Sequence, residues 1–213
     1  MMIGPEAYYD ERLKGKKAGE IEKEIRRLRR EISRLKKVIE HPRYFRDTCP
    51  SEDTVIWCDR LYLERAKQAL VDEGGVYIPT AAEKRADRFQ ADIPHICKLE
   101  LSIWRFDGEM KRRSYTVCGG EIRLDITDPS DVLDTELYDE DMDRDGLLSS
   151  VAELHIGEWR SHYDPSRFGY EALDGESWEL TVRYSGGRRS RKFSGSNSYP
   201  YNFGDLTALF CID

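Results

Sequence analysis

The sequence lacks the segments that would place it in a membrane or in a secretory pathway. No apolar run approaches the ~20 residues that a membrane span requires, and residues 1–10 contain no apolar stretch of the signal-peptide type. The five cysteines are scattered, with no Cys-x-x-Cys pair, so we expect free thiols instead of a disulfide framework. These absences predict a cytoplasmic protein with no membrane partner.

Motifs that hold a cofactor or build an active site are also missing. No glycine pair leads into Gly-Lys-Ser/Thr, and no serine has Gly-x-Ser-x-Gly spacing. His155 and His162 lie two turns apart on a predicted helix, too far to chelate one metal, and His95 with Cys97 has no second ligand pair. We therefore predict no metal and no cofactor. A non-enzymatic function is favoured, and an enzyme of unknown class is an alternative because carboxylates are abundant.

One acidic motif has the start of a calcium-binding loop. Asp141, Asp143 and Asp145 occupy the first, third and fifth positions of an EF-hand, and a glycine follows. The twelfth position, which supplies a bidentate glutamate in that motif, is Ala152, and Glu153 comes one residue late. The favoured interpretation is a solvated loop whose acids lie near the positive N-terminus of the next helix.

The N-terminal third of the chain predicts long helices. Six apolar residues are spaced alternately by four and three, which is typical of a helix that packs along one seam; they are Ile21, Ile25, Leu28, Ile32, Leu35 and Ile39. A second helix is expected over residues 53–72, and a short one between residues 5 and 15. In an antiparallel, coiled-coil-like hairpin over residues 1–75, the apolar faces of the two long helices bury each other. Homo-oligomerisation through the first helix is the alternative.

The remainder of the chain predicts an α+β domain. Residues 76–95 contain two prolines and scattered charges, and are interpreted as a linker with a possible short helix over residues 81–88. Residues 96–213 follow the order βββ-α-ββ-α, which indicates a small antiparallel sheet with packed helices. The expected strands cover residues 96–106, 112–118, 121–126, 178–184 and a polar edge strand at 188–194, and the helices begin at residues 147 and 203.

The C-terminal stretch has the most specific pattern. It reads Asp174-Gly175, Trp178, Leu180, Tyr184 and Gly187, then Gly195-x-Asn197-x-Tyr199-Pro200-x-Asn202-Phe203-x-x-Leu206. This pattern resembles the C-terminal signature of a group of uncharacterised bacterial and mobile-element proteins. The resemblance covers about 35 residues and implies a fold without an attached activity. Within it, Asn202 is expected to cap the last helix.

Charge is segregated along the chain, whose net charge is −7. Residues 11–37 hold twelve basic and five acidic residues, whereas residues 125–145 hold ten acids and only Arg144. Such segregation predicts a partner with a complementary charge pattern. The acids assigned to a partner-binding surface are Asp131, Asp134, Glu136, Asp139, Glu140, Asp141, Asp143 and Asp145.

Two hypotheses follow from the charges. The preferred one is a bacterial or phage protein that binds a protein partner through its acidic loop and helical hairpin, as an inhibitor of a nucleic-acid-binding host or defence protein. The alternative is direct nucleic-acid binding through basic side chains of the first helix and one strand. The residues assigned to that alternative are Arg26, Arg27, Arg30, Arg34, Lys37, Arg189 and Arg191.

Overall fold

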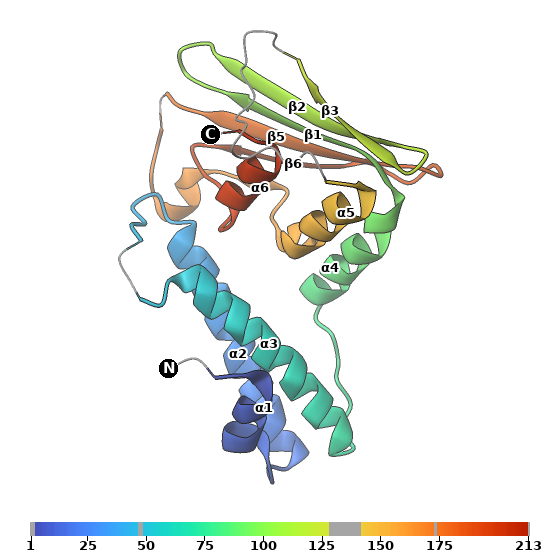
Figure 1. Ribbon diagram of the computed structural model, residues 1–213. Helices are drawn as coiled ribbons and strands as arrows, with labels where there is room; N and C mark the ends of the chain where they lie inside the picture. The colour runs from blue at the N-terminus through green and yellow to red at the C-terminus, as the bar shows by residue number, and fades with distance from the viewer. Residues whose placement is uncertain (1–2, 47–48, 128–141, 173, 213) are drawn as a thin grey trace. The chain divides into compact units, whose positions relative to one another are not determined.

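The computed structural model describes residues 3–46, 49–127, 142–172 and 174–212. The chain divides into two compact units, Met1–Pro79 and Thr80–Asp213, which we call unit 1 and unit 2. Unit 1 is helical, whereas unit 2 combines helices with a six-stranded sheet (Figure 1). The predicted α+β class is therefore confirmed.

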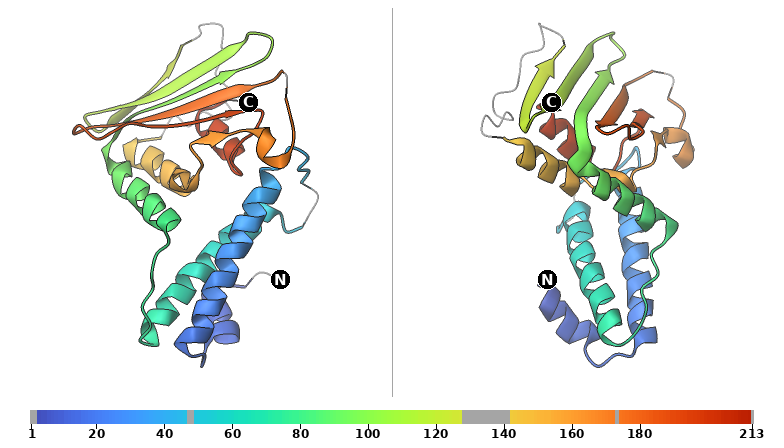
Figure 2. Two further views of the ribbon diagram at one scale, coloured as in Figure 1. Left: turned by 180° about the vertical axis from the view of Figure 1, so that it is seen from behind. Right: turned by 90° about the vertical axis from the view of Figure 1, so that its right-hand side faces the viewer.

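Unit 1 is built around two long helices, α2 (Ala18–Ile39) and α3 (Glu52–Asp72). They lie side by side and run in opposite directions in all views (Figure 1, Figure 2). Five of the six residues in the predicted apolar stripe are buried, and Leu28 is fully inaccessible. Burial of each leucine or isoleucine side chain contributes about 1.5–3 kcal/mol, so this seam is the main interaction that holds α2 in place.

The short helix expected near the N-terminus packs on α3. It consists of α1 (Pro5–Tyr8) and a π-helical turn, η1 (Tyr9–Leu13). Tyr8 stacks on Tyr62 of α3 with ring centroids 4.1 Å apart, and the Tyr62 hydroxyl donates a hydrogen bond to the Ile3 carbonyl at 2.7 Å. The described part of unit 1 therefore contains three packed helical segments, and α3 is covered by two of them.

Unit 2 contains one sheet with strand order β3-β2-β1-β5-β6-β4. All neighbouring strands are antiparallel except β4, which pairs with β6 in parallel. The sheet is therefore mixed, which corrects the antiparallel sheet predicted from the sequence, and β6 is an inner strand instead of the predicted edge. The bounds are β1 (Ile96–Trp104), β2 (Met110–Cys118), β3 (Glu121–Ile126), β4 (His162–Tyr163), β5 (Ser177–Tyr184) and β6 (Arg191–Ser196).

One face of the sheet carries the core of unit 2. Alternate side chains of a strand point to the same face, and on β1 and β5 these are Leu99, Leu101 and Ile103 with their neighbours Val182, Leu180 and Trp178. Three helices cover this face (Figure 2), namely α4 (Ala81–Asp92), α5 (Arg144–Glu153) and α6 (Phe203–Leu209). The opposite face presents polar and charged side chains, as expected for a half-buried sheet.

Part of the predicted linker is helical. Thr80 and Glu83 form a capping box at the start of α4, in which the Glu83 carboxylate accepts a hydrogen bond from the Thr80 N–H at 2.8 Å. Phe89 is fully buried in the core of unit 2. A single buried aromatic residue on a charged helix gives only a weak periodic signal, which is why the sequence indicated at most a short helix here.

The helix predicted over residues 147–163 is shorter than its apolar residues suggested. α5 ends at Glu153, and His155 has a left-handed backbone with φ of 48°. Trp159 and Tyr163 are buried, but they follow the helix, and Tyr163 lies on β4. An irregular segment that packs against the core also contains apolar residues at intervals. The spacing of apolar residues therefore does not distinguish such a segment from a continuation of the helix.

Candidate functional site

The residues of the C-terminal signature are used to build unit 2. The Trp178 indole N–H donates to the Ser198 carbonyl at 3.0 Å and lies against Gly195, where a Cβ atom would be 2.4 Å from the indole nitrogen. Asn197 has a positive φ of 49°, and its side chain accepts a hydrogen bond from the Glu176 N–H at 3.0 Å. Gly195 is therefore required by a close approach, and Asn197 by a turn.

Asn202 has a different role from the one predicted. Its side chain makes no cap for α6. Instead, its amide N–H donates to the Leu154 carbonyl at 2.8 Å, and its oxygen accepts from the Trp159 indole at 3.1 Å. These bonds connect the start of α6 to the end of α5. The signature positions thus maintain packing, and we assign no chemistry to them.

Most of the predicted acidic surface lies outside the described residues. This holds for Asp131, Asp134, Glu136, Asp139, Glu140 and Asp141. Asp143 is the N-cap of α5, accepting a hydrogen bond from the Gly146 N–H at 2.8 Å, and Asp145 contacts Arg144 at 2.9 Å. The two described acids therefore lie at the N-terminus of α5, where a cap and negative charge are favourable.

The described part of the chain offers little for metal or acyl-transfer chemistry. It contains no group of three His, Cys, Asp or Glu side chains arranged to hold a metal ion. It also contains no helix that is both long and apolar enough to span a membrane. His162 Nδ1 lies 2.9 Å from the Ser194 hydroxyl, but His162 is exposed on the short strand β4. A nucleophilic serine requires a base that is itself oriented in an enclosed site, and this pair does not provide one.

The outer face of α2 gathers basic side chains. With about 3.6 residues per turn, these side chains fall within an arc of about 100° on the side opposite the buried seam. All are exposed, and no acidic residue of α2 falls in the arc. They extend over about 21 Å along the helix axis. We call this set the basic face, and its members are Lys23, Arg26, Arg27, Arg30, Arg34 and Lys37.

Half of the basic face is paired within the helix. The pairs are Arg26–Glu22 at 3.4 Å, Arg27–Glu24 at 2.9 Å and Arg34–Glu31 at 2.7 Å. The first and third pairs are exposed, and exposed pairs three or four residues apart contribute only about 0.3–0.5 kcal/mol each, so a phosphate can replace Glu22 or Glu31 at little cost. Within the described chain, Arg30 donates only to the Arg26 carbonyl, and Lys23 and Lys37 have no ion pair.

The other predicted basic residues belong to unit 2. Arg191 lies 3.8 Å from Asp92 and over the Phe89 ring at 5.6 Å, so its charge is used to attach α4 to the sheet. Arg188 contacts the same Asp92 at 3.4 Å. Arg189 is exposed. The structure therefore brings the predicted residues of α2 together on one surface and places Arg189 and Arg191 in the other unit.

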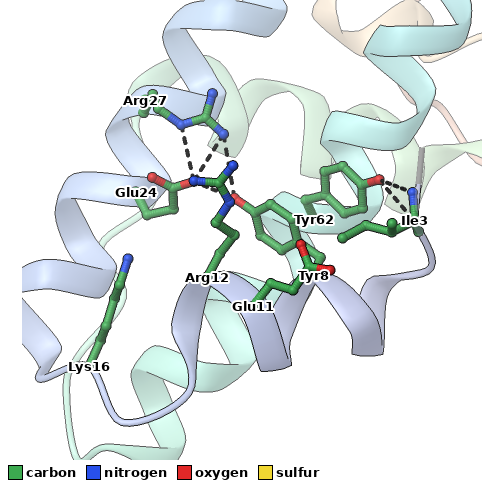
Figure 3. Close-up of a pocket in the computed structure, with 8 residues that line it drawn as sticks. All are labelled: Ile3, Tyr8, Glu11, Arg12, Lys16, Glu24, Arg27 and Tyr62. Carbon is green, nitrogen blue, oxygen red and sulfur yellow. Dashed lines mark hydrogen bonds and ion pairs between the residues drawn. The ribbon is translucent and has the colours of Figure 1, made fainter. Parts of the chain in front are cut away.

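A cleft with a volume of about 610 Å³ opens beside α2 (Figure 3). Arg27 belongs both to this cleft and to the basic face. The cleft is lined by Ile3, Tyr8, Glu11, Arg12, Lys16, Glu24, Arg27 and Tyr62. It lies in unit 1 where the N-terminal segment approaches the first half of α2, and three of its lining residues are cations.

The polar groups at the centre of the cleft bond to one another. Glu24 accepts hydrogen bonds from Arg27 at 3.0 and 2.9 Å and from the Tyr8 hydroxyl. Burial raises the pKa of Tyr8, and the bond to Glu24 adds to this effect. Burial alone would raise the pKa of Glu24, but the bonds from Arg27 and Tyr8 lower it below its usual value. Tyr8 is thus a neutral donor, and Glu24 is ionised.

Asp59 is a buried carboxylate on the inner side of α3. Its side chain is only 7% exposed, and Oδ2 has no hydrogen-bond partner among the described residues. Burial raises the pKa of Asp59, the charge of Arg27 lowers it, and Glu31 and Glu24 raise it. Such a group costs folding free energy when it is ionised.

Sequence reasoning missed Lys23 and the two cleft cations Arg12 and Lys16. The signal for Lys23 was present, because it precedes Arg30 by seven residues and therefore shares its face. No such signal existed for Arg12 and Lys16, because their position depends on how the N-terminal segment folds back on α3. Comparison of the chain with protein-family models, curated proteins and solved structures finds no match.

Proposed function

We propose that the protein binds nucleic acid through the basic face of α2. The observation that carries this proposal is the alignment of six exposed cations over about 21 Å of one helix with no acid of α2 among them. Four of the six are arginines, whose planar guanidinium groups match the geometry of phosphate oxygens. Together these cations neutralise several phosphates, and the release of counterions drives binding.

The composition of α2 favours binding without strong sequence preference. The helix contains no asparagine or glutamine, the side chains that read adenine edges in the major groove. Contacts to phosphates position a protein on nucleic acid but carry no sequence information directly. We therefore expect similar affinities for unrelated sequences and a strong dependence on salt.

Charge reversal on α2 tests the proposal. Arg26, Arg30, Arg34 and Lys37 are changed to glutamate, and Arg27 is kept because it bonds to Glu24 and Tyr8. Binding is measured by fluorescence anisotropy with single-stranded and duplex DNA and with RNA. We expect the affinity of the wild-type protein for duplex DNA to fall with salt at a log–log slope of roughly −4 to −5, and the variant to lose at least about 100-fold at low salt.

A matched variant reverses four exposed cations of unit 2, namely Lys84, Arg85, Arg88 and Arg189. Its net charge equals that of the α2 variant, so it controls for the change in total charge. We expect it to retain most of the wild-type affinity. Equal binding by the wild-type protein and the α2 variant, with helix content unchanged by circular dichroism, would rule out the proposal.

A second candidate function is binding of a basic protein partner by the acidic segment. It is supported by the ten acids against one arginine in residues 125–145. Such a partner would be a nucleic-acid-binding protein whose phosphate-binding surface the acids occupy. Replacement of Asp131, Asp134, Glu136, Asp139 and Glu140 by their amides should abolish its capture from nuclease-treated lysate. Retention of the same partner by the amide variant would exclude this function.

A further inference from the structure

The cleft beside α2 contains more positive charge than its own carboxylates use. Arg27 is bonded to Glu24, which leaves Arg12, Lys16 and Glu11. Within the described residues, neither Arg12 nor Lys16 forms an ion pair. Figure 3 shows both side chains extending towards Glu24 from the N-terminal segment. The Lys16 ammonium is close enough to contribute to lowering the pKa of Glu24.

The cleft also contains a hydroxyl and an apolar wall. The Tyr8 hydroxyl donates to Glu24 and accepts from Arg27 Nη2 at 3.4 Å, so its orientation is fixed. Tyr8 and Tyr62 are buried and stacked on each other, so their faces are not available for a nucleobase. The volume of the cleft is within the range of small-ligand pockets. Its recognition groups are therefore cationic and suit an anion in preference to a ring.

We propose that this cleft binds a phosphate monoester, namely the phosphorylated end of a nucleic-acid strand whose backbone lies on the basic face. The inference rests on the proposed function, because Arg27 is the residue that the two surfaces share. A terminal phosphate carries about −1.5 to −2 charges at pH 7 and three acceptor oxygens, whereas an internal phosphodiester carries one charge. Counting Glu11, which also lines the cleft, the groups that remain sum to one positive charge, and Arg12 and Lys16 supply donors for the additional acceptor oxygens of a terminal phosphate.

The test compares oligonucleotides of one sequence that differ only at the end. Strands with a 5′-phosphate, a 3′-phosphate or hydroxyls at both ends are titrated by fluorescence anisotropy. We expect one of the phosphorylated strands to bind about tenfold more tightly than the hydroxyl strand, because it adds charge-assisted hydrogen bonds. Arg12→Ala combined with Lys16→Ala should abolish that difference and change the affinity for the hydroxyl strand less than twofold.

The control variant removes two cations from the same segment outside the cleft, Lys14→Ala with Lys17→Ala. Both residues are exposed, and neither lines the cleft. The tenfold preference should persist in this variant. Equal affinity of the wild-type protein for phosphorylated and hydroxyl strands would overturn the inference while leaving the proposed function intact. Loss of the preference in the control variant to the same degree would also overturn it.

A calorimetric titration with a nucleoside 5′-monophosphate distinguishes a free mononucleotide from the end of a strand as the source of the phosphate monoester. Binding of the mononucleotide that depends on Arg12 and Lys16, without binding of any oligonucleotide, would support the monoester site and sink the proposed function. Absence of mononucleotide binding together with a preference for phosphorylated strands would support the strand end as the source. Absence of all binding would overturn both proposals.

Discussion

Unit 1 and unit 2 differ in how they use their basic side chains. In unit 2, Arg113 is 1% exposed and donates to the Phe210 carbonyl at 3.1 Å, and Arg188 and Arg191 both contact Asp92. Arg113 connects the end of α6 to the sheet, and the two partly exposed pairs place further cations against the end of α4. In unit 1, the basic face of α2 is exposed, and the hydrogen bonds and ion pairs that its side chains form among the described residues lie within α2 or join it to Tyr8.

The difference separates cations that hold the fold from cations that are available to a ligand. A charge that is buried and hydrogen-bonded is part of the structure, since removal of its partner leaves an uncompensated group. An exposed charge in a weak intrahelical pair contributes little to stability. Unit 2 should therefore respond to substitutions mainly through its stability, and unit 1 mainly through binding. The following substitutions test this division.

The largest effect is expected from Gly195→Val. A Cβ atom at this position would lie 2.4 Å from both the Trp178 indole nitrogen and the Ser198 carbonyl oxygen, so backbone or indole must move. Overpacking of this kind costs roughly 3 kcal/mol or more. Thermal unfolding monitored by near-ultraviolet circular dichroism should show a lower midpoint for unit 2. Gly204→Ala is the control, because nothing lies within 4 Å of its Cβ position. Equal midpoints for the two variants would contradict the assignment.

Asn202→Ala should have the next largest effect. The substitution leaves the Leu154 carbonyl and the Trp159 indole N–H without their partner. Loss of a partner for a buried polar group costs about 1–3 kcal/mol, so the free energy of unfolding of unit 2 should fall by about 2 kcal/mol in denaturant titrations. Asn202→Asp keeps an acceptor for the indole but places a carboxylate oxygen against the Leu154 carbonyl oxygen, so it should destabilise unit 2 at least as much as alanine does. Stability equal to that of the wild-type protein in both variants would argue against the bridging role.

The elements that the sequence predicted well are those in which local pattern and burial agree. The apolar residues of α2 form the packing seam, because residues spaced alternately by four and three fall on one face of a helix. Apolar and polar residues alternate from Trp178 to Tyr184, and this segment forms β5, because successive side chains of a strand point to opposite faces. β4 was not predictable, because a two-residue strand is defined by its partner and not by its own pattern.

The candidate site was predictable only in part. Arg26, Arg30 and Arg34 follow from the register of α2, since an exposed helical face can be read from spacing. The cleft cannot be read in this way, because Arg12 and Lys16 line it together with Glu24 only through the packing of the N-terminal segment, in which Tyr8 stacks on Tyr62. Contacts between segments that are distant in sequence depend on tertiary packing, on which a single sequence gives no direct information.

Asp59→Asn is expected to stabilise unit 1, which would distinguish it from the destabilising changes in unit 2. The wild-type carboxylate is buried without a partner for Oδ2 and faces Glu24, Arg27 and Glu31 of α2. Removing its charge should increase the free energy of unfolding by about 1 kcal/mol at pH 7. Chemical denaturation is the measurement. The control is Glu73→Gln, at an exposed position just after α3, which should change the free energy of unfolding by less than about 0.5 kcal/mol.

The pH dependence of this gain has a defined sign. Because the folded-state pKa of Asp59 is raised above its ordinary value of 3.8, the folded protein takes up the proton at a higher pH than the unfolded chain. The penalty of the ionised carboxylate is therefore present at neutral pH and disappears as pH falls through the folded-state pKa. The advantage of the asparagine variant should shrink towards pH 4. An advantage that grows on acidification would contradict the burial argument.

The smallest effect is expected from Lys23→Gln, which removes one cation from the basic face. Lys23 is exposed and forms no ion pair among the described residues, so the free energy of unfolding should not change measurably. If Lys23 contacts one phosphate, the salt slope for duplex DNA should decrease in magnitude by about 0.9, and the affinity at low salt should fall by a few fold for every sequence alike. Lys84→Gln, on α4 of unit 2, should leave both quantities unchanged. If Lys84→Gln reduced the salt slope as much as Lys23→Gln does, the total charge of the protein would govern binding. The cations of unit 1 would then have no special role in binding nucleic acid.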